Sequence, residues 1–195
     1  MTMKIGVLAL QGDFVEHIEM LKRAGAAGIE VRLPPDLAEI DGLIIPGGES
    51  TSIGKLAVLY DLIEPIRKLA ETQPVWGTCA GAIFLSKEVH HQQPVLGLMD
   101  IVVRRNAFGR QVDSFETDLD VPALAAAGTG QSRPFHAIFI RAPVIERVSA
   151  EAEVLARLPD GRIVAVREGN LLATSFHPEL TRDDRFHRYF LSLGR

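Results

Sequence analysis

The stretch Val75-Trp76-Gly77-Thr78-Cys79-Ala80-Gly81-Ala82-Ile83-Phe84-Leu85 joins an apolar strand to an apolar helix through a turn of small residues. Small residues on both sides of such a turn form an elbow that presents the central side chain. That side chain is Cys79, the single cysteine of the chain, and the start of a helix favours its thiolate. The pattern therefore predicts a nucleophile. The alternative is that Cys79 is one more small buried side chain.

A second segment, Thr174-Ser175-Phe176-His177-Pro178-Glu179, ends another apolar run. Residues two apart in an extended chain project to the same side, so His177 and Glu179 can lie side by side. Pro178 favours this extended form. A cysteine nucleophile needs a base, and the base needs a partner, so Cys79, His177 and Glu179 form a candidate catalytic triad. Considered singly, His177 could instead be a strand-end histidine bonded to backbone, and Glu179 a solvated acid at a helix start.

A third segment, Pro46-Gly47-Gly48-Glu49-Ser50-Thr51, follows an apolar run directly. Adjacent glycines let backbone N–H groups approach a ligand, as an oxyanion site or a phosphate cradle requires. The spacing to the next Gly-Lys pair does not fit a P-loop. We therefore predict oxyanion donors at Gly48 and at Ala80, the residue after the nucleophile. Ser50 or Thr51 is also expected to cap the following helix.

Apolar runs alternate with amphipathic segments, which predicts an α/β fold: a three-layer, mostly parallel, flavodoxin-like sheet flanked by helices. Gly47, Cys79 and His177 all fall at the ends of expected strands, where such sheets bind ligands. Shorter strands in the second half are expected to be partly antiparallel, with a hairpin turn at Asp160-Gly161. The expected strands are residues 4–10, 31–33, 43–45, 75–78, 101–104, 115–121, 135–140, 154–158, 163–167 and 171–175. The expected helices start near residue 14 and cover 52–60, 62–70, 80–89 and 182–193.

Length and composition narrow the class of protein. The 195 residues predict a single domain over 1–195, and the formal net charge of −4 without long basic runs argues against a nucleic-acid groove. No membrane-length apolar stretch and no signal-peptide pattern occur, so the cytoplasm is expected, where a lone cysteine stays reduced. No G-x-G-x-x-G follows an expected strand, so no cofactor is expected. His90-His91 lies in a polar loop without further ligand-type residues, so no metal is expected either.

These segments, in this order, resemble the class I glutamine amidotransferases, and more narrowly the glutaminase subunits of pyridoxal 5′-phosphate synthase. The narrower likeness rests on five segments: Leu8-Ala9-Leu10-Gln11-Gly12 with Glu16-His17, Pro46 to Thr51, Arg105-Asn106-Ala107-Phe108-Gly109-Arg110-Gln111, Phe139-Ile140-Arg141-Ala142-Pro143, and Ser175 to Thr181. His17, His136 and His187 are read as ordinary packing or surface histidines, and this reading is weaker for His17, which belongs to these segments.

The resemblance implies hydrolysis of L-glutamine to glutamate and ammonia, with the ammonia passed to a synthase subunit, a (β/α)₈ barrel enzyme, in a hetero-oligomer. It also implies that the partner docks near Gln11-Gly12 and sets the oxyanion peptide at Gly47-Gly48. The residues implied to bind glutamine are Gly47, Gly48, Glu49, Arg105, Ile140 and Arg141. For Arg105 a bidentate pair with the substrate carboxylate is a physical reason, whereas a surface pair with a local acid is its alternative.

Two other functions stay open at this point. A related cysteine hydrolase, such as a γ-glutamyl hydrolase or a glutaminase serving another synthase, would keep the triad and change the partner. A non-catalytic regulatory subunit would keep the sheet without the chemistry, although the intact Cys79, His177 and Glu179 speak against it.

Overall fold

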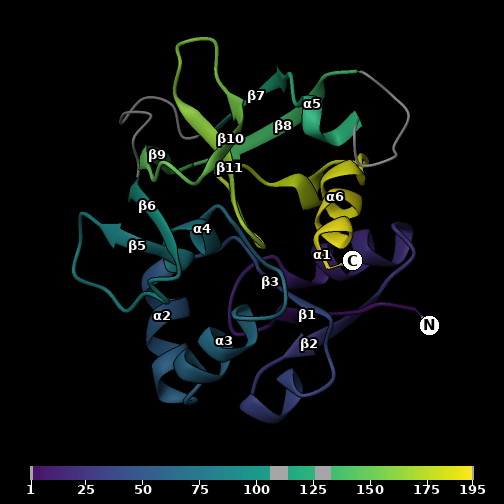
Figure 1. The fold of residues 1–195 in the computed structure, drawn as a ribbon, viewed down its shortest axis with the longest axis vertical. Coiled ribbons are helices and arrows are strands. Elements are labelled where there is room, and N and C mark those ends of the chain that lie inside the picture. Colours follow the sequence, from purple (N-terminus) through teal and green to yellow (C-terminus); the bar gives the residue numbers. More distant parts are fainter. Residues whose placement is uncertain (1, 106–113, 126–132, 195) are drawn as a thin grey trace.

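A computed structural model describes residues 2–105, 114–125 and 133–194, which form an α/β fold built on one large sheet (Figure 1). Its strand order is β2-β1-β3-β4-β12-β11-β9-β6-β5, and β10 pairs with β11. The strands are β1 (Lys4–Leu8), β2 (Ala27–Val31), β3 (Gly42–Ile45), β4 (Val75–Thr78), β5 (Ser86–Val89), β6 (Met99–Arg104), β9 (Val144–Val148), β10 (Glu153–Arg157), β11 (Ile163–Glu168) and β12 (Leu171–Thr174).

The sheet changes character at β12. From β2 to β12 all neighbours are parallel, whereas β12-β11, β11-β10, β11-β9 and β9-β6 are antiparallel. The prediction of a mostly parallel sheet with antiparallel strands in the second half is confirmed. The Asp160-Gly161 hairpin also lies where it was predicted, between β10 and β11, with Gly161 at φ 89°.

Helices cover both faces of this sheet and make three layers. Figure 1 shows α1 and α6 together on one side, and the two core clusters assign α2, α3 and α4 to the opposite face. In β3, Leu43 and Ile45 face the α2–α4 layer while Ile44 faces α6, as the alternation of a strand requires. The helices are α1 (Phe14–Arg23), α2 (Ser50–Leu59), α3 (Ile63–Ala70), α4 (Ala80–Leu85), α5 (Pro122–Leu124) and α6 (Arg185–Leu193). Short 3-10 turns cover Pro34–Leu37 and Pro178–Leu180.

The expected helix over residues 80–89 is wrong in its second half. Helix α4 ends at Leu85, and the next four residues form β5, which pairs in parallel with β6. The Ser86 hydroxyl donates to the Ile83 carbonyl at 2.8 Å and so replaces the next helical hydrogen bond. Pairing with β6 then satisfies the backbone that a longer helix would have satisfied.

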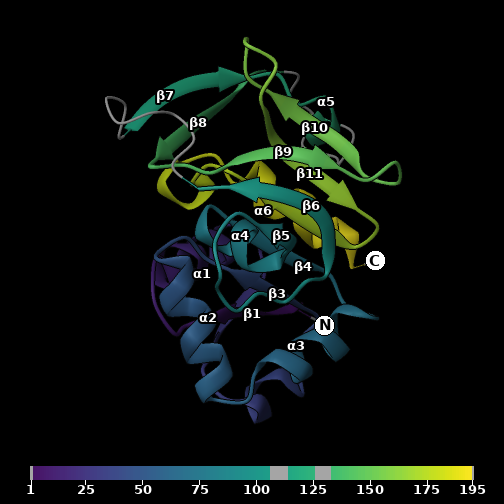
Figure 2. The same cartoon turned by 90° about the vertical axis from the view of Figure 1, so that its left-hand side faces the viewer.

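Two strands also differ from the prediction. The strand expected at 31–33 lies earlier, as β2, because the amides of Arg32 and Leu33 both donate to Asp36 at 2.9 Å and start a turn. Strand β9 was not predicted, although it follows Pro143 directly. In addition, β7 (Ser114–Leu119) and β8 (Phe135–Ile140) leave the main sheet and form a separate antiparallel ribbon, at the top of Figure 2.

Among the described residues no helix combines the length and the hydropathy that crossing a bilayer would need. The expected connection from Asp120 to Pro134 lies partly outside the described residues, since 126–132 are not among them. The segment from Asn106 to Gln111 lies entirely outside the described residues.

Gly81 lets α4 approach β3 closely, and its replacement should be costly. A Cβ at Gly81 would lie 2.0 Å from the Ile45 carbonyl oxygen, a backbone atom that cannot move aside easily. We expect Gly81→Ala to lower the free energy of unfolding by about 3 kcal/mol or more, measured by urea denaturation. Gly169→Ala is the control, because its Cβ meets nothing within 4 Å and only its φ of 60° is unfavourable. Equal losses for the two variants would contradict the close-approach explanation.

Candidate active site

Three neighbouring parallel strands deliver the predicted site residues to one edge of the sheet. Gly47 follows β3, Cys79 follows β4 and His177 follows β12, and β4 pairs with both of the others. The carboxyl ends of parallel strands meet at the same edge, so the prediction that these three residues converge is confirmed. The backbone locks the arrangement, because the Cys79 amide donates to the Thr174 carbonyl at 2.8 Å.

Cys79 occupies the strained elbow that the sequence predicted. Its φ of 48° and ψ of −105° are unfavourable for a residue with a side chain. The turn places Ala80 at the first position of α4, where the backbone N–H has no helical partner. The Cys79 Sγ lies 3.9 Å from the Ile140 carbonyl oxygen, which brings the end of β8 beside the sulfur. Cys79 is only 7% exposed, so a substrate would reach it within a largely enclosed site.

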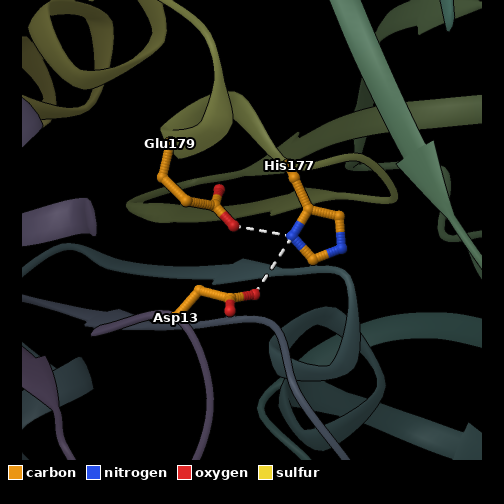
Figure 3. Close-up of side chains that lie close together, drawn as sticks. All are labelled: Asp13, His177 and Glu179. Atoms are coloured by element: carbon orange, nitrogen blue, oxygen red, sulfur yellow. Dashed lines mark hydrogen bonds and ion pairs between the residues drawn. The ribbon is translucent and has the colours of Figure 1, made fainter. Parts of the chain in front are cut away.

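His177 and Glu179 form a short buried hydrogen bond, with His177 Nδ1 and Glu179 Oε1 2.6 Å apart. Figure 3 shows a second carboxylate, Asp13, directed at the same ring nitrogen, at 3.4 Å. Because Nδ1 carries one hydrogen, the shorter contact to Glu179 takes it. The His177 amide also donates to the Ile138 carbonyl at 2.8 Å, which fixes the residue between β12 and β8.

The surroundings of His177 favour its protonated form. Burial opposes the charge, but hydrogen bonds with Asp13, Cys79 and Glu179 outweigh burial and raise the pKa of His177 to about 12. Burial raises the pKa of Glu179, and the bond to His177 opposes that rise. An imidazolium beside a cysteine stabilises the thiolate, as in other cysteine enzymes. The surroundings therefore keep a positive charge on His177, beside the Cys79 sulfur.

The glycine loop after β3 lies directly against His177. A Cβ at Gly47 would meet the His177 Cε1 at 2.5 Å, and one at Gly48 would meet the Gln11 Oε1 at 2.4 Å. The Asp13 amide donates to the Gly47 carbonyl at 3.2 Å. Since the peptide is trans, the Gly48 N–H points to the side opposite that carbonyl.

Glu49 begins α2 and binds Arg105. Its carboxylate accepts hydrogen bonds from the Thr51 and Ser52 amides, so Glu49 is the N-cap and the prediction of Ser50 or Thr51 as cap is wrong. Although partial burial opposes ionisation, bonds from Ser52 and Thr51 lower the pKa of Glu49 to about 2. The Arg105 guanidinium lies 2.9 Å from Glu49 Oε1. The local acid pair considered for Arg105 therefore exists, and it lies one residue from Gly48.

Arg141 is the remaining residue expected to bind substrate. It lies directly after Ile140, at the end of β8, and has a φ of 44°. A strained residue next to the contact between Ile140 and Cys79 fits a functional position better than a simple strand end. Its side chain is exposed.

Three further residues lie near the triad: Asp13, which the sequence analysis did not single out, and His17 and His187, which it read as ordinary packing or surface histidines. Asp13 precedes α1 and His17 lies one turn later on the same face, a spacing of four that could have drawn attention to them. His17 Nε2 lies 3.3 Å from Glu179 Oε2, and His17 Nδ1 lies 3.0 Å from His187 Nε2. Both histidines are fully buried, so the alternative of a surface role is wrong for them. His136, in contrast, is exposed between Glu116 and Asp118.

The two buried histidines should make the protein sensitive to acid. Burial lowers the pKa of His17 well below its ordinary value and that of His187 to about 3. Below about pH 6.5 the unfolded chain binds protons at these rings that the folded chain does not, so stability is lost as pH falls. Near pH 5, each ring lowers the free energy of unfolding by about 1.4 kcal/mol for each unit by which the pH falls. The raised pKa of Glu179 has the opposite effect, because the folded chain then binds a proton more readily than the unfolded chain does.

We expect His187→Phe to reduce this slope by about 1.4 kcal/mol per pH unit, in urea denaturation at pH 7, 6 and 5. His91→Gln, at an exposed histidine, should leave the slope as in the unmodified protein. An unchanged slope in His187→Phe would show that His187 is protonated in the folded chain.

Asp13, His177 and Glu179 also bring ligand-type atoms within 4.8 Å of one another. The 2.6 Å separation of His177 Nδ1 from Glu179 Oε1 is that of a hydrogen bond and leaves no room for a cation between them. We therefore assign this cluster to proton chemistry.

Fold and site together define a class of enzyme. A solved structure described as a glutamine amidotransferase superposes with a TM-score of 0.90 at 54% identity, covering 97% of this chain and 98% of that one. The chain belongs to the SNO glutamine amidotransferase family, whose sequence model matches residues 7–193.

Curated relatives agree with this family. A pyridoxal 5′-phosphate synthase subunit PdxT from Herpetosiphon aurantiacus is 61% identical over 98% of this chain and 100% of its own length. One from Dehalococcoides mccartyi is 58% identical over 99% of this chain and 98% of its own length. The resemblance inferred from the sequence is confirmed.

Proposed function

We propose that this chain hydrolyses the side-chain amide of L-glutamine to glutamate and ammonia, for the synthesis of pyridoxal 5′-phosphate. The observation that carries the proposal is the elbow cysteine Cys79 beside the buried pair of His177 and Glu179, 2.6 Å apart. Membership of the glutamine amidotransferase family and the names of the relatives support glutamine as substrate. In this proposal residues 1–195 form one glutaminase domain, active in the cytoplasm, where Cys79 stays reduced.

The reaction proceeds in two halves. The Cys79 thiolate attacks the amide carbon and a C–S bond forms, while His177 gives its Nε2 proton to the departing nitrogen. The C–N bond breaks and ammonia leaves. Water then attacks the thioester, His177 takes one of its protons, and the C–S bond breaks to release glutamate. Glu179 holds the Nδ1 proton of His177 throughout and balances the charge of the imidazolium.

Backbone groups stabilise the oxyanion of each half-reaction. The donors are the N–H of Ala80, which has no helical partner at the start of α4, and the N–H of Gly48. Such donors act strongly because they are fixed before the charge develops, and the loss of one typically costs about 2.7–4 kcal/mol.

Glu49 and Arg105 recognise the two charges of the amino acid. Their side chains lie 2.9 Å apart and offer opposite charges next to the glycine loop. The α-carboxylate of glutamine pairs with the Arg105 guanidinium, and the α-ammonium pairs with the Glu49 carboxylate. Gly47 and Gly48, with Ile140 and Arg141 at the end of β8, complete the binding site around the side-chain amide.

We expect Arg105→Gln to raise the KM for glutamine about 10–100-fold with a smaller effect on kcat, because a charged hydrogen bond to the substrate contributes about 1.5–3 kcal/mol. Steady-state ammonia release measures both constants. The matched control is Arg104→Gln, since the neighbouring Arg104 pairs with Glu146 at 2.8 Å instead. A KM that rises equally in both variants would contradict the assignment.

The ammonia passes to a synthase subunit, a (β/α)₈ barrel enzyme, in a hetero-oligomer. Water would protonate most of the ammonia and remove its nucleophilicity, so direct transfer favours the synthesis. The partner contacts the segment around Gln11-Gly12. Gln11 Oε1 accepts from the Glu49 amide at 2.6 Å, so a shift of Gln11 would move the glycine loop. Formation of pyridoxal phosphate from glutamine by the two subunits tests the whole proposal, and full glutaminase activity of the isolated chain would contradict activation by the partner.

A further inference from the structure

The candidate triad is the outer part of a longer buried chain of polar groups. Glu179 Oε1 faces His177, and Glu179 Oε2 faces His17 Nε2 at 3.3 Å. His17 Nδ1 in turn lies 3.0 Å from His187 Nε2. The side chains of His17 and Glu179 are completely buried, and His187 is buried as well. This series of polar side chains runs from His177, beside Cys79, through Glu179 and His17 to His187 on α6, and its inner members are fully buried.

Glu179 Oε2 needs a donor in this interior. Within the described residues it has no well-aligned hydrogen bond. His17 Nε2 lies 3.3 Å from this oxygen, and Thr78 Oγ1 also approaches His17 Nε2, at 3.2 Å. A buried carboxylate without donors takes up a proton rather than remain charged. The His17 N–H, which faces both Glu179 and Thr78, adds to the bond from His177 in opposing this proton uptake.

The hydrogen-bond partners decide which ring nitrogen of His17 and of His187 carries the proton. Among the described residues His187 Nδ1 is buried with no partner, and a bare acceptor there costs less than a buried N–H without an acceptor. His187 therefore carries its proton on Nε2 and donates it to His17 Nδ1. His17 then carries its own proton on Nε2, which faces Glu179 and Thr78. If both rings instead carried their protons on Nδ1, the N–H of His187 would have no acceptor and His17 would present no N–H to Glu179.

We propose that His17 and His187 are positioning residues that hold Glu179 ionised and so keep the tautomer of His177 needed by Cys79. The inference rests on the proposed function of the triad. Both rings stay neutral, because burial lowers their pKa values, so the N–H of His17 faces Glu179 without cancelling the charge of the carboxylate. The charged or titratable groups that face this chain are Asp13 and His177 around Glu179, and Asp184 near His187.

The kinetic test uses the complex with the synthase and compares His17→Phe with His17→Gln. The phenyl ring keeps the shape and removes the donor, whereas the glutamine amide can place an N–H near the former Nε2 position. We expect His17→Phe to lower kcat about 10–100-fold and to move the acidic limb of the kcat/KM profile up by about one pH unit. His17→Gln should restore most of both, and His187→Phe should shift the limb in the same direction by less. An unshifted limb in His17→Phe would overturn the proposal, because loss of packing alone lowers stability without moving the profile.

Nitrogen NMR of the unmodified protein, with ¹⁵N-labelled histidine, keeps the proposal testable if the variants do not fold. It should show protonated Nε2 and bare Nδ1 in both His17 and His187 at neutral pH. The reverse tautomers would overturn the proposal. Cys79→Ala separates this inference from the proposed function. If that variant lacks activity while the His17 variants keep an unchanged profile, only the positioning role fails, whereas full activity of Cys79→Ala would refute the triad itself.

Discussion

Replacing Cys79 with serine should reduce glutamine hydrolysis by about 10⁴-fold or more. The exchange keeps the shape of the elbow and of α4, but a serine hydroxyl at this position has no base strong enough to ionise it. The sulfur nucleophile of the proposed mechanism therefore disappears. Ammonia release from glutamine by the complex with the synthase measures the loss.

Supply of ammonium salt provides the control for Cys79→Ser. The synthase subunit should still form pyridoxal phosphate from added ammonium in the presence of this variant, since the defect lies in making ammonia and not in docking. Loss of the ammonium-dependent reaction would indicate a damaged interface, and retained glutamine hydrolysis would remove Cys79 from the mechanism.

Glu179→Gln should lower kcat by about 10²–10⁴-fold with little change in overall fold. The amide has nearly the volume of the carboxylate, but it cannot balance the imidazolium of His177, and its NH₂ group can face the ring nitrogen in place of an acceptor. With this charge removed, the pKa of His177 falls and the positive charge beside Cys79 is held less firmly. Alkylation of Cys79 by iodoacetamide at pH 7 should slow together with kcat.

Glu116→Gln is the matched control for Glu179→Gln. Glu116 also binds a histidine, His136, at 2.8 Å, but both side chains are exposed on the β7–β8 ribbon. We expect neither kcat nor the alkylation rate to change in Glu116→Gln. If the two variants behaved alike, the burial of the His177–Glu179 pair would have no catalytic consequence.

The features that sequence could predict are those encoded over a few residues. The elbow around Cys79, the glycines after β3 and the spacing of His177 and Glu179 each occupy one short segment, and their strand ends meet because parallel strands align them. The same local signals gave the hairpin at Asp160-Gly161.

The missed features depend on partners distant in sequence. Residues 86–89 are helical by their neighbours alone, and only pairing with β6 makes them a strand. His17 and His187 are 170 residues apart, and the sequence around neither of them predicts their contact. Their burial follows from the packing of α1 and α6 on the same face of the sheet, which a residue pattern does not specify.

Labelling of the complex with a diazoketone analogue of glutamine tests the central claim most directly. A nucleophile that attacks the side-chain carbonyl position of glutamine should be trapped by this analogue as a stable thioether. We predict stoichiometric modification of Cys79, found by mass spectrometry of its peptide, with loss of activity in proportion and protection by glutamine. Complete inactivation with Cys79 unmodified, or with the label on another residue, would contradict the account.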